Sequence, residues 1–570
     1  MGEQVGVLVE RRLLGSARDA NVPLLAPLAA LASVEETCVR EKAVDSFCAL
    51  VRGLDAAAVA EHVVPRLQQL AQAEWFPNRV SVCGLYATAY QRLGGAGAGG
   101  GEAVAEAKRQ LRTQFATLCG DDTPMVRRAA AKNIGALVPV VEREFVRGEL
   151  FPLFRALAGD DPDSVRLLAI ENGCTAFAKV FTPAENADVL QLVQSCVGDK
   201  SWRVRNNVAR DFFPLSEAMG ADAARGELLP LFVRLLQDPE GEVRASAARN
   251  LAGVVSLVGT ELFVADVLPV VRELVGVPRD GGALGVGSAG GGDATQTVRA
   301  ALAEALVGVM AAAGAGAAGE AAVAPLHAAV LPLILQFLRD DAPDVRLRVL
   351  DGLGSVVRGA GAKFLQDSVL PVLYVLSGDA LWRVREKVLL QMPLLAESLG
   401  AQLFESRLLD LYLGTYGDQV NAVRMAATRQ LEPLAQKLGA AWVRSRIVPR
   451  LLSLYHAEGS SYLQRITVLY AVRNLSVRAA PAGGAGGAAA ASVDLHDVAE
   501  DLLPLLLEAP RDPVPNVRFV SLQVLAEAVR SGAYDRGTVA ARIDPAIQAC
   551  ALSDPDSDVK FFAGEALRRD

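Results

Sequence analysis

Apolar residues recur along the chain in pairs of stretches with helical spacing. In the segment 226–259, which reads GELLPLFVRLLQDPEGEVRASAARNLAGVVSLVG, two such stretches flank a polar turn. Their apolar positions are Leu228, Leu229, Phe232, Leu235 and Leu236, then Val243, Ala247, Leu251 and Val254. Spacings of three and four residues place side chains on one face of a helix. The pattern therefore predicts two helices that meet at the turn.

The polar turn carries residues that are typical of a helix start. Asp238 is a predicted N-cap, and Pro239 suits the first helical position. Glu240 and Glu242 complement the positive end of the second helix. Pro230, early in the first helix, predicts a bend there. The same turn recurs as DTPMVR, DPDSVR, DAPDVR, DPVPNVR and DPDSDVK.

A basic residue ends each Val-Arg phrase and marks the repeat. The markers are Arg40, Arg79, Arg127, Arg166, Arg205, Arg244, Arg299, Arg346, Arg385, Arg424, Arg465, Arg518 and Lys560. Their separations are 39, 48, 39, 39, 39, 55, 47, 39, 39, 41, 53 and 42, so 39 is the common period. A helix pair of this size cannot bury both apolar faces alone, so the copies must stack. We therefore expect an all-α fold, an α-α superhelix of about thirteen helix pairs forming an elongated horseshoe, in which each arginine reaches the aspartate of a neighbouring turn.

Gly/Ala-rich insertions explain the longer separations and divide the chain. They lie at 94–101, 281–292, 311–322 and 480–491. Such loops lengthen at little entropic cost. The predicted parts are a partial repeat at 1–20, N-terminal repeats at 21–278, a Gly-rich insertion at 279–296, central to C-terminal repeats at 297–479, an insertion at 480–491 and C-terminal repeats at 492–570.

Two of the four tryptophans lie in nearly identical phrases, DKSWRVR and DALWRVR. Most other units place Pro, Ser, Asn or Asp at this point, which a core position would not tolerate. Trp202 and Trp382 are therefore predicted to lie on the ridge of turns, beside Arg203 and Arg383, as anchors for another protein. The alternative is a ring folded over its own helix as a surface patch. Trp75 occupies the corresponding turn near the start of the chain and receives the same interpretation.

Composition removes several other functions. The net charge of −8 gives no electrostatic reason to expect nucleic acid or an anionic membrane as a partner. The seven cysteines form no C-x-x-C pair and are expected to be small buried side chains in a reducing compartment. The apolar run 321–338 follows the repeat, so it predicts a buried helix and no membrane span. The four histidines fall in different units without a catalytic motif, so no enzyme activity, metal or cofactor is expected.

The array resembles HEAT repeats, and several of its phrases are more specific than that pattern. VEETCVREKAVDS, EWFPNRVSVCGLY, CGDDTPMVRRAAA, DKSWRVR, DALWRVR, DPVPNVRF and DVKFFAGEAL resemble the scaffold (A, 65 kDa regulatory) subunit of protein phosphatase 2A. The resemblance covers essentially the whole chain apart from the Gly/Ala insertions.

The resemblance implies a non-catalytic platform within a heterotrimer rather than a homo-oligomer. It implies that the C-terminal repeats (363–479 and 492–570) hold a serine/threonine phosphatase catalytic subunit, whereas the N-terminal repeats hold an interchangeable regulatory subunit. The regulatory-subunit residues implied are Glu35, Glu36, Trp75, Asp122, Thr123, Pro124, Arg127, Arg128, Ser201, Trp202 and Arg203. The catalytic-subunit residues implied are Trp382, Arg383, Tyr462, Leu463, Arg465, Arg518 and Phe519.

The sequence departs from the family in its number of repeats. The family has fifteen, whereas thirteen are marked here, so we expect the first repeat and part of the second to be missing. The insertion 279–296 is expected to protrude between the two partner regions. The expected location is the cytoplasm, with the nucleus as a second compartment.

Two other functions are compatible with a stacked helical array. A transport adaptor of the karyopherin type would bind a small GTPase or Phe-Gly repeats, but the chain lacks the acidic inner loop and the length usual for such proteins. An enzyme would show turnover by the isolated chain.

Overall fold

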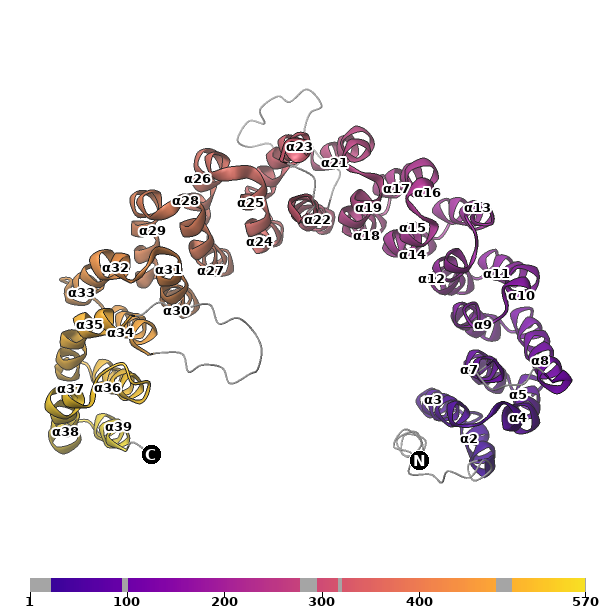
Figure 1. The fold of residues 1–570 in the computed structure, drawn as a ribbon, viewed down its shortest axis with the longest axis horizontal. Coiled ribbons are helices and arrows are strands. Elements are labelled where there is room, and N and C mark those ends of the chain that lie inside the picture. The colour runs from indigo at the N-terminus through magenta and orange to yellow at the C-terminus, as the bar shows by residue number, and fades with distance from the viewer. Residues whose placement is uncertain (1–21, 95–100, 277–294, 316–319, 478–494, 569–570) are drawn as a thin grey trace. The chain divides into compact units, whose positions relative to one another are not determined.

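The protein is described by a computed structural model for residues 22–94, 101–276, 295–315, 320–477 and 495–568 (Figure 1). Every regular element within these residues is helical, and the marked basic residues lie in the second helices of successive pairs. The predicted all-α superhelix is confirmed. The predicted segments 1–20, 279–296 and 480–491 lie wholly or almost wholly outside the described residues, so they remain predictions.

The chain divides into two compact units, Met1–Ala305 and Leu306–Asp570, and the boundary in the sequence falls within α22 (Gln296–Ala315). In each unit consecutive helix pairs lie side by side in chain order (Figure 1). The first unit contains η1 (Val22–Leu24), α2 (Leu25–Leu31), α3 (Thr37–Gly53), α4 (Ala56–Ala58), η2 (Val59–Val63), α5 (Val64–Ala71), α6 (Phe76–Val82), α7 (Tyr86–Leu93), α8 (Glu102–Cys119), α9 (Pro124–Leu137), α10 (Arg143–Phe145), η3 (Val146–Leu150), α11 (Phe151–Ala158), α12 (Asp163–Val180), α13 (Asn186–Val197), α14 (Trp202–Arg210), α15 (Phe212–Met219), α16 (Ala221–Ala223), η4 (Ala224–Leu228), α17 (Leu229–Leu236), α18 (Gly241–Arg249), α19 (Leu251–Val258), α20 (Thr260–Leu262), η5 (Phe263–Val267) and α21 (Leu268–Val275).

The second unit continues from α22 with the same alternation. Its elements are α23 (Glu320–Leu338), α24 (Pro343–Asp351), α25 (Leu353–Phe364), η6 (Leu365–Val369), α26 (Leu370–Leu376), α27 (Trp382–Leu390), α28 (Met392–Arg407), α29 (Leu409–Gly414), η7 (Thr415–Gly417), α30 (Asn421–Arg429), α31 (Leu431–Leu438), α32 (Ala440–Trp442), η8 (Val443–Ile447), α33 (Val448–His456), α34 (Tyr462–Ser476), α35 (His496–Glu508), η9 (Ala509–Arg511), α36 (Pro515–Arg530), α37 (Arg536–Thr538), η10 (Val539–Ile543), α38 (Asp544–Ser553) and α39 (Ser557–Leu567). The apolar run 321–338 lies within α23, and none of the described helices is long and apolar enough to cross a membrane.

The apolar pattern of 226–259 predicted the core correctly. The residues that it selected are all buried, each at most 3% exposed. The second helix differs from the prediction because it is divided into α18 and α19 at Asn250. The Asn250 amide nitrogen donates to the carbonyl oxygen of Ala209, and its amide oxygen accepts the N–H of Phe213, both in the preceding repeat. The break in the helix thus forms a polar link between repeats.

The N-cap prediction for Asp238 is wrong. Helix α18 begins at Gly241 rather than at Pro239, and the side chain of the preceding residue, Glu240, makes no capping hydrogen bond. Asp238 instead accepts the N–H of Glu240 at 2.9 Å and pairs with Arg205 of the preceding repeat. The ion pair holds the carboxylate two residues before the N-cap, where it closes the turn.

The expected irregularity at Pro230 takes the form of a π turn. Pro230 is the second residue of α17 and follows the five-residue π segment η4. A proline ring clashes with the carbonyl four residues earlier, and the wider π turn relieves this contact. The described residues repeat this arrangement at η2, η3, η5, η6, η8 and η10, each followed two residues later by a proline. Pro332 and Pro504 lie inside α23 and α35 instead, so proline alone does not decide where a π turn forms.

The second helices of neighbouring repeats approach most closely at glycines. A Cβ atom on Gly135 of α9 would lie 1.9 Å from the carbonyl oxygen of Asn172 in α12. One on Gly253 of α19 would lie 2.5 Å from the ring of Phe213 in α15. These positions set the distance between consecutive repeats, because no side chain fits there.

We expect Gly135→Ala to destabilise the first unit by about 2 kcal/mol, because the methyl group meets backbone rather than a movable side chain. Urea-induced unfolding followed by circular dichroism would measure the loss. Gly148→Ala is the matched control, since its Cβ would have no atom within 4 Å. Equal stability of the two variants would contradict the close approach at Gly135.

Candidate protein-interaction surface

Each turn between the two helices of a repeat is closed by its own arginine and linked to the next turn. Arg166 donates from Nη1 to the carbonyl oxygens of Asp160 and Asp161, at 2.8 and 2.7 Å. Its Nε and Nη2 donate to the two carboxylate oxygens of Asp199, at 2.8 and 2.9 Å. Asp199 also accepts the N–H of Ser201 at 2.7 Å. One guanidinium thus closes its own turn and grips the following one.

The same pair recurs along both units, and we call the series the Arg–Asp ladder. Its closest N···O distances are 2.6–2.8 Å, and each side chain is at most 19% exposed. The pairs are Arg79–Asp121, Arg127–Asp160, Arg166–Asp199, Arg205–Asp238, Arg346–Asp379, Arg385–Asp418, Arg465–Asp512 and Arg518–Asp554. The predicted contact between arginine and the neighbouring aspartate is confirmed.

Two of the marker arginines, Arg40 and Arg424, have no ion pair with an aspartate of the next turn among the described residues. Several rungs join residues 33 apart in sequence. At that separation from Arg40 lies Ala73, and at that separation from Arg424 lies Ala457. Arg40 closes its own turn and bonds the hydroxyl of Thr37 at 3.1 Å. The described ladder is therefore interrupted at Arg40 in the first unit and at Arg424 in the second.

The ladder also favours the ionised form of four of its carboxylates. Burial acts to raise the pKa of Asp199, but the hydrogen bonds from Arg166 and from the Ser201 N–H outweigh burial and lower it. The same balance lowers the pKa of Asp121, Asp418 and Asp554. The partner arginine gains in turn, because the bond to Asp199 raises the pKa of Arg166.

The first two residues of several second helices point outward beside the ladder. Trp202 begins α14 and Trp382 begins α27, and both residues are half-buried. The exposed guanidinium of Arg203 lies 5.1 Å from the centre of the Trp202 ring, and that of Arg383 lies 4.8 Å from the Trp382 ring. The tryptophans thus lie at the turn as predicted, with part of each ring covered by its neighbours.

Trp75 differs from the other two tryptophans by one position. It precedes α6 as the N-cap residue, and Phe76 takes the first helical position. Trp75 is 52% exposed and its ring centre lies 5.7 Å from that of Phe76. This turn therefore presents two neighbouring aromatic rings.

The residues predicted for a regulatory subunit lie in turns of the first unit. Exposed members are Glu35, Glu36, Trp75, Asp122, Pro124, Arg128 and Arg203. Half-buried members are Thr123, Arg127, Ser201 and Trp202. Three of the half-buried side chains connect turns, since the Thr123 hydroxyl bonds Arg79, Arg127 is a ladder residue, and Ser201 donates to Asp163 at 2.9 Å.

The residues predicted for a catalytic subunit lie in turns of the second unit. Arg383, Tyr462 and Leu463 are exposed, Trp382, Arg465 and Phe519 are half-buried, and Arg518 is buried. The guanidinium groups of Arg465 and Arg518 already bind Asp512 and Asp554. Their contact with a partner remains a prediction, and within the chain they are structural.

Sequence reasoning missed two exposed apolar residues of these turns and a third within α39. Phe76 is 37% exposed, Met125 is 51% exposed and Phe561 is 63% exposed. Phe76 stands three residues before its marker, like Trp382, and Met125 stands two before, like Arg383. Counting back from the marker would have found both.

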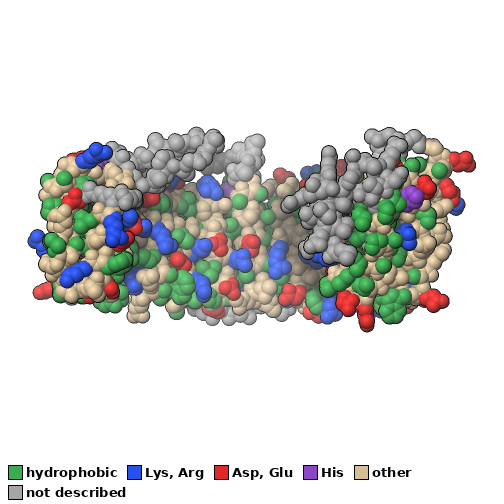
Figure 2. Space-filling model, turned by 90° about the horizontal axis from the view of Figure 1, so that it is seen from below, with side chains coloured by type: hydrophobic (Ala, Val, Ile, Leu, Met, Phe, Trp, Pro, Cys, Tyr) green, Lys and Arg blue, Asp and Glu red, His purple; other side chains and the backbone are tan. Residues whose placement is uncertain are grey.

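Other chemistry is sparse in the described part of the chain. Basic and acidic side chains are interspersed on the face drawn in Figure 2, without a patch of one sign among the described residues. No three His, Cys, Asp or Glu side chains of the described residues form a possible metal site. Burial raises the pKa of the Cys196 thiol to about 12. Cys38 is exposed, so the expectation of buried cysteines is wrong there, because it occupies the second position of α3 on the outer side of the turn.

Two segments of the chain match family models. Residues 111–141 match the HEAT repeat, and residues 221–278 match the PPP2R1A-like HEAT repeat. These two segments are thus similar to HEAT repeats, and they lie within an all-α array of stacked helix pairs.

Curated relatives narrow the resemblance. The chain is 43% identical over 154 residues to the protein phosphatase 2A scaffold subunit of Dictyostelium discoideum, covering 27% of this chain and 24% of that one. It is 43% identical over 123 residues to the serine/threonine-protein phosphatase PP2A 65 kDa regulatory subunit of Drosophila melanogaster, covering 22% and 19%. The matched segments thus span 24% or less of the length of these relatives. The predicted resemblance to phosphatase 2A scaffold subunits is confirmed.

Solved structures with a similar fold include karyopherins. Kap121p bound to Pho4p superposes with a TM-score of 0.57 at 14% identity, covering 97% of this chain and 54% of that one. A Kap121p mutant gives 0.56 at 14% identity, covering 96% and 53%. The structural similarity supports the helical solenoid fold, but at 14% identity it carries no information about function.

The ladder predicts sensitivity to acid. Asp199 has a lowered pKa in the folded state, so its contribution to stability is present above the unfolded value, about 4, and is lost as pH falls through the folded value. Asp199→Asn should cost about 3 kcal/mol at neutral pH, since Arg166 then stays buried without a counter-charge. The variant should also lose part of the acid dependence. Thermal melting from pH 7 to pH 3 would measure both effects.

Asp222→Asn is the matched control for this experiment. Its carboxylate is fully exposed and lies 3.9 Å from Arg225, so no measurable change is expected. If Asp199→Asn melts like the wild type at neutral pH, the ladder does not stabilise the fold.

Proposed function

We propose that this protein is a non-catalytic scaffold that assembles protein phosphatase 2A. In this proposal the C-terminal repeats bind the catalytic subunit, whereas the N-terminal repeats bind an interchangeable regulatory subunit. The product is a heterotrimer in the cytoplasm, and in the nucleus as a second compartment. The similarity to proteins named as phosphatase 2A scaffold and 65 kDa regulatory subunits supports the choice of phosphatase 2A as the enzyme that this chain assembles.

One observation carries the proposal. Aromatic and basic side chains occupy the outer positions of ladder turns, as in Trp382–Arg383 and Trp202–Arg203. Interfaces use such pairs as anchors because they combine large apolar area with directed hydrogen bonds. The ladder holds the anchors in fixed positions, so they lose little freedom on binding.

Separate anchors in the two units support two different partners. The first unit offers Trp75, Phe76 and Met125 near acidic residues of the same turns, such as Glu74 and Asp122. The second offers Tyr462, Leu463 and Phe561. Surfaces of different composition favour different partners rather than two copies of one.

Trp382→Ala should weaken binding of the purified phosphatase 2A catalytic subunit by at least about thirtyfold, or about 2 kcal/mol. Calorimetry or biolayer interferometry would measure the affinity. Trp202→Ala is the matched control, because it removes the same Trp–Arg pair from the first unit. It should leave this affinity unchanged and weaken a regulatory subunit instead. Equal loss of catalytic-subunit binding in both variants would contradict the assignment of partners.

The purified chain alone should not hydrolyse a phosphoserine peptide. After addition of the catalytic subunit, the activity should elute with the chain in gel filtration. Hydrolysis of the peptide by the purified chain alone would refute a purely structural role.

A further inference from the structure

Arg424 marks the interruption of the Arg–Asp ladder in the second unit. The residue is 6% exposed. Its Nη1 donates to the carbonyl oxygens of Asp418 and Gln419 at 2.7 and 3.2 Å, and Nη2 donates to Asn421 Oδ1 at 3.2 Å. Its Nε is buried without a hydrogen-bond partner among the described residues; the Nε atoms of Arg346 and Arg465 are too, but those two guanidinium groups contact a ladder aspartate and Arg424 does not. The Nε/Nη2 edge is the one that holds a carboxylate in the complete rungs, such as Arg385–Asp418.

Ala457 occupies the place of the missing aspartate. It follows Arg424 by 33 residues, the separation found between Arg385 and Asp418. Its backbone angles, φ −57° and ψ 137°, match those of Asp418 (−59°, 141°) and Asp554 (−62°, 139°). Ala457 and Asp554 directly follow α33 and α38, whereas Asp418 follows the short 3₁₀ segment η7 at the end of α29. The backbone thus presents a methyl group where the other turns present a carboxylate.

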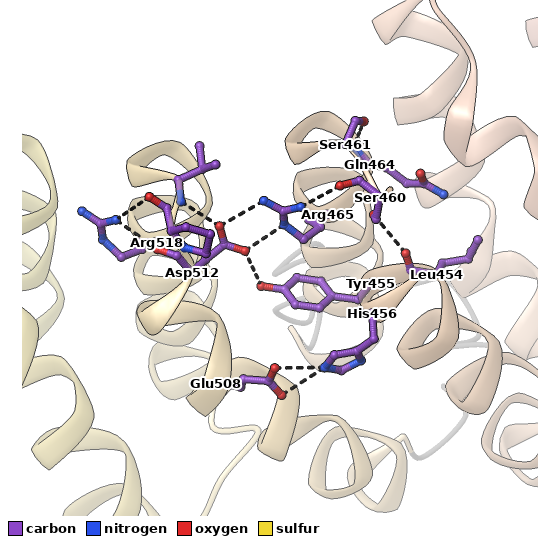
Figure 3. A network of polar contacts seen from close by, with 12 residues as sticks. Leu454, Tyr455, His456, Ser460, Ser461, Gln464, Arg465, Glu508, Asp512 and Arg518 are labelled. Carbon is purple, nitrogen blue, oxygen red and sulfur yellow. Dashed lines mark hydrogen bonds and ion pairs between the residues drawn. The ribbon is translucent and has the colours of Figure 1, made fainter. Parts of the chain in front are cut away.

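The turn that begins at Ala457 is ordered without a ladder aspartate, and its acidic residue, Glu458, is exposed. It has five residues, 457–461, between α33 and α34, whereas three residues, 418–420, lie between η7 and α30. Ser461 caps α34 by accepting the N–H of Gln464, and Arg465 closes the turn on the carbonyl oxygen of Ser460 (Figure 3). Figure 3 also shows the next rung complete, with Asp512 held by Arg465 and by the hydroxyl of Tyr455.

Arg424 therefore keeps a buried positive charge, and the Nε/Nη2 edge of its guanidinium has only part of its hydrogen bonds satisfied. A buried donor without a partner is costly, and a charged one more so. Arg40, at the other interruption, is partly exposed, so water can complete its hydrogen bonds. A group that supplies two acceptor oxygens to Arg424 would gain free energy that Arg40 does not offer.

The ligand that fits this edge is a carboxylate, because the arginines of the eight described rungs each bind one. Asn421 is exposed and bonds Nη2, so it leads from the surface to the fork. Tyr462 and Leu463 are exposed at the start of α34, in the following turn. A protein that covers these residues therefore has a route to Arg424.

We propose that the open edge of Arg424 is a carboxylate-binding site, filled by an Asp or Glu side chain of the phosphatase catalytic subunit. This inference rests on the proposed function, since the occupant belongs to the partner assigned there. On docking, the partner's carboxylate displaces the Asn421 amide and accepts from Nε and Nη2. The complex thereby contains a complete rung that the free chain lacks.

Ala457→Asp tests the proposal by filling the site from within. Because position 457 has the backbone of the aspartate turns, the new carboxylate should bind Arg424 and raise the melting temperature. The same variant should lose at least about tenfold in affinity for the purified catalytic subunit, because the partner's carboxylate is excluded. Arg424→Lys, which keeps the charge but removes the fork, should weaken binding similarly.

Ser461→Asp is the matched control. It adds the same charge to the same turn and conserves a capping side chain, so it should bind within about twofold of wild type. Wild-type affinity in Ala457→Asp would overturn the proposal, as would equal weakening by Ser461→Asp, which would mean simple charge repulsion. If Arg424→Lys fails to fold, Ala457→Asp still decides. A wild-type chain that does not bind the catalytic subunit refutes the proposed function itself, and this partner with it.

Discussion

The fold depends on a guanidinium that serves two turns at once. Each ladder arginine satisfies carbonyl oxygens of its own turn and the carboxylate of the next, as Arg166 does with Asp160 and Asp199. A buried ion pair stabilises only when its remaining donors are also satisfied. Here the turn supplies those acceptors, so the pair can be buried between repeats. Apolar faces alone would let neighbouring helix pairs slide, whereas the ladder fixes their register.

The same turns carry the surface on which partners are proposed to bind. Trp382 and Arg383 lie two to three residues before Arg385, whose side chain is held by Asp418. A recognition residue on such a turn inherits the rigidity of the rung beneath it. Preorganised anchors bind more tightly because less side-chain and loop entropy is lost. Stability and recognition therefore share one short segment of each repeat.

The sequence predicted the elements and the ladder, because both are written in residue spacing. Apolar periodicity selected Phe232 and Leu251 as core residues, and the marker period selected the arginines. The role of Asp238 was misjudged because local capping competes with Arg205, a residue from another repeat. The π turn before Pro230 was expected only as a bend, since its form depends on how the helix packs. Phe76 was overlooked because Trp75, one residue earlier, was taken as the counterpart of Trp202 and Trp382. Partner contacts of Arg518 could not be judged from sequence, because burial decides whether its guanidinium is free.

The five-residue turn at 457–461 links the length of a loop to chemistry. Two extra residues leave the helices on either side in phase, since α33 and α34 still pack as a pair. What differs is the pairing of Arg424. The other described rungs hold an aspartate of the next turn, whereas the Nε of Arg424 has no hydrogen-bond partner among the described residues. A turn that is two residues longer, with an alanine at the helix end, thus changes the pairing of a buried arginine while the helix pair stays packed. In such arrays, the length of a turn therefore matters for the pairing between repeats as well as for the surface that the turn presents.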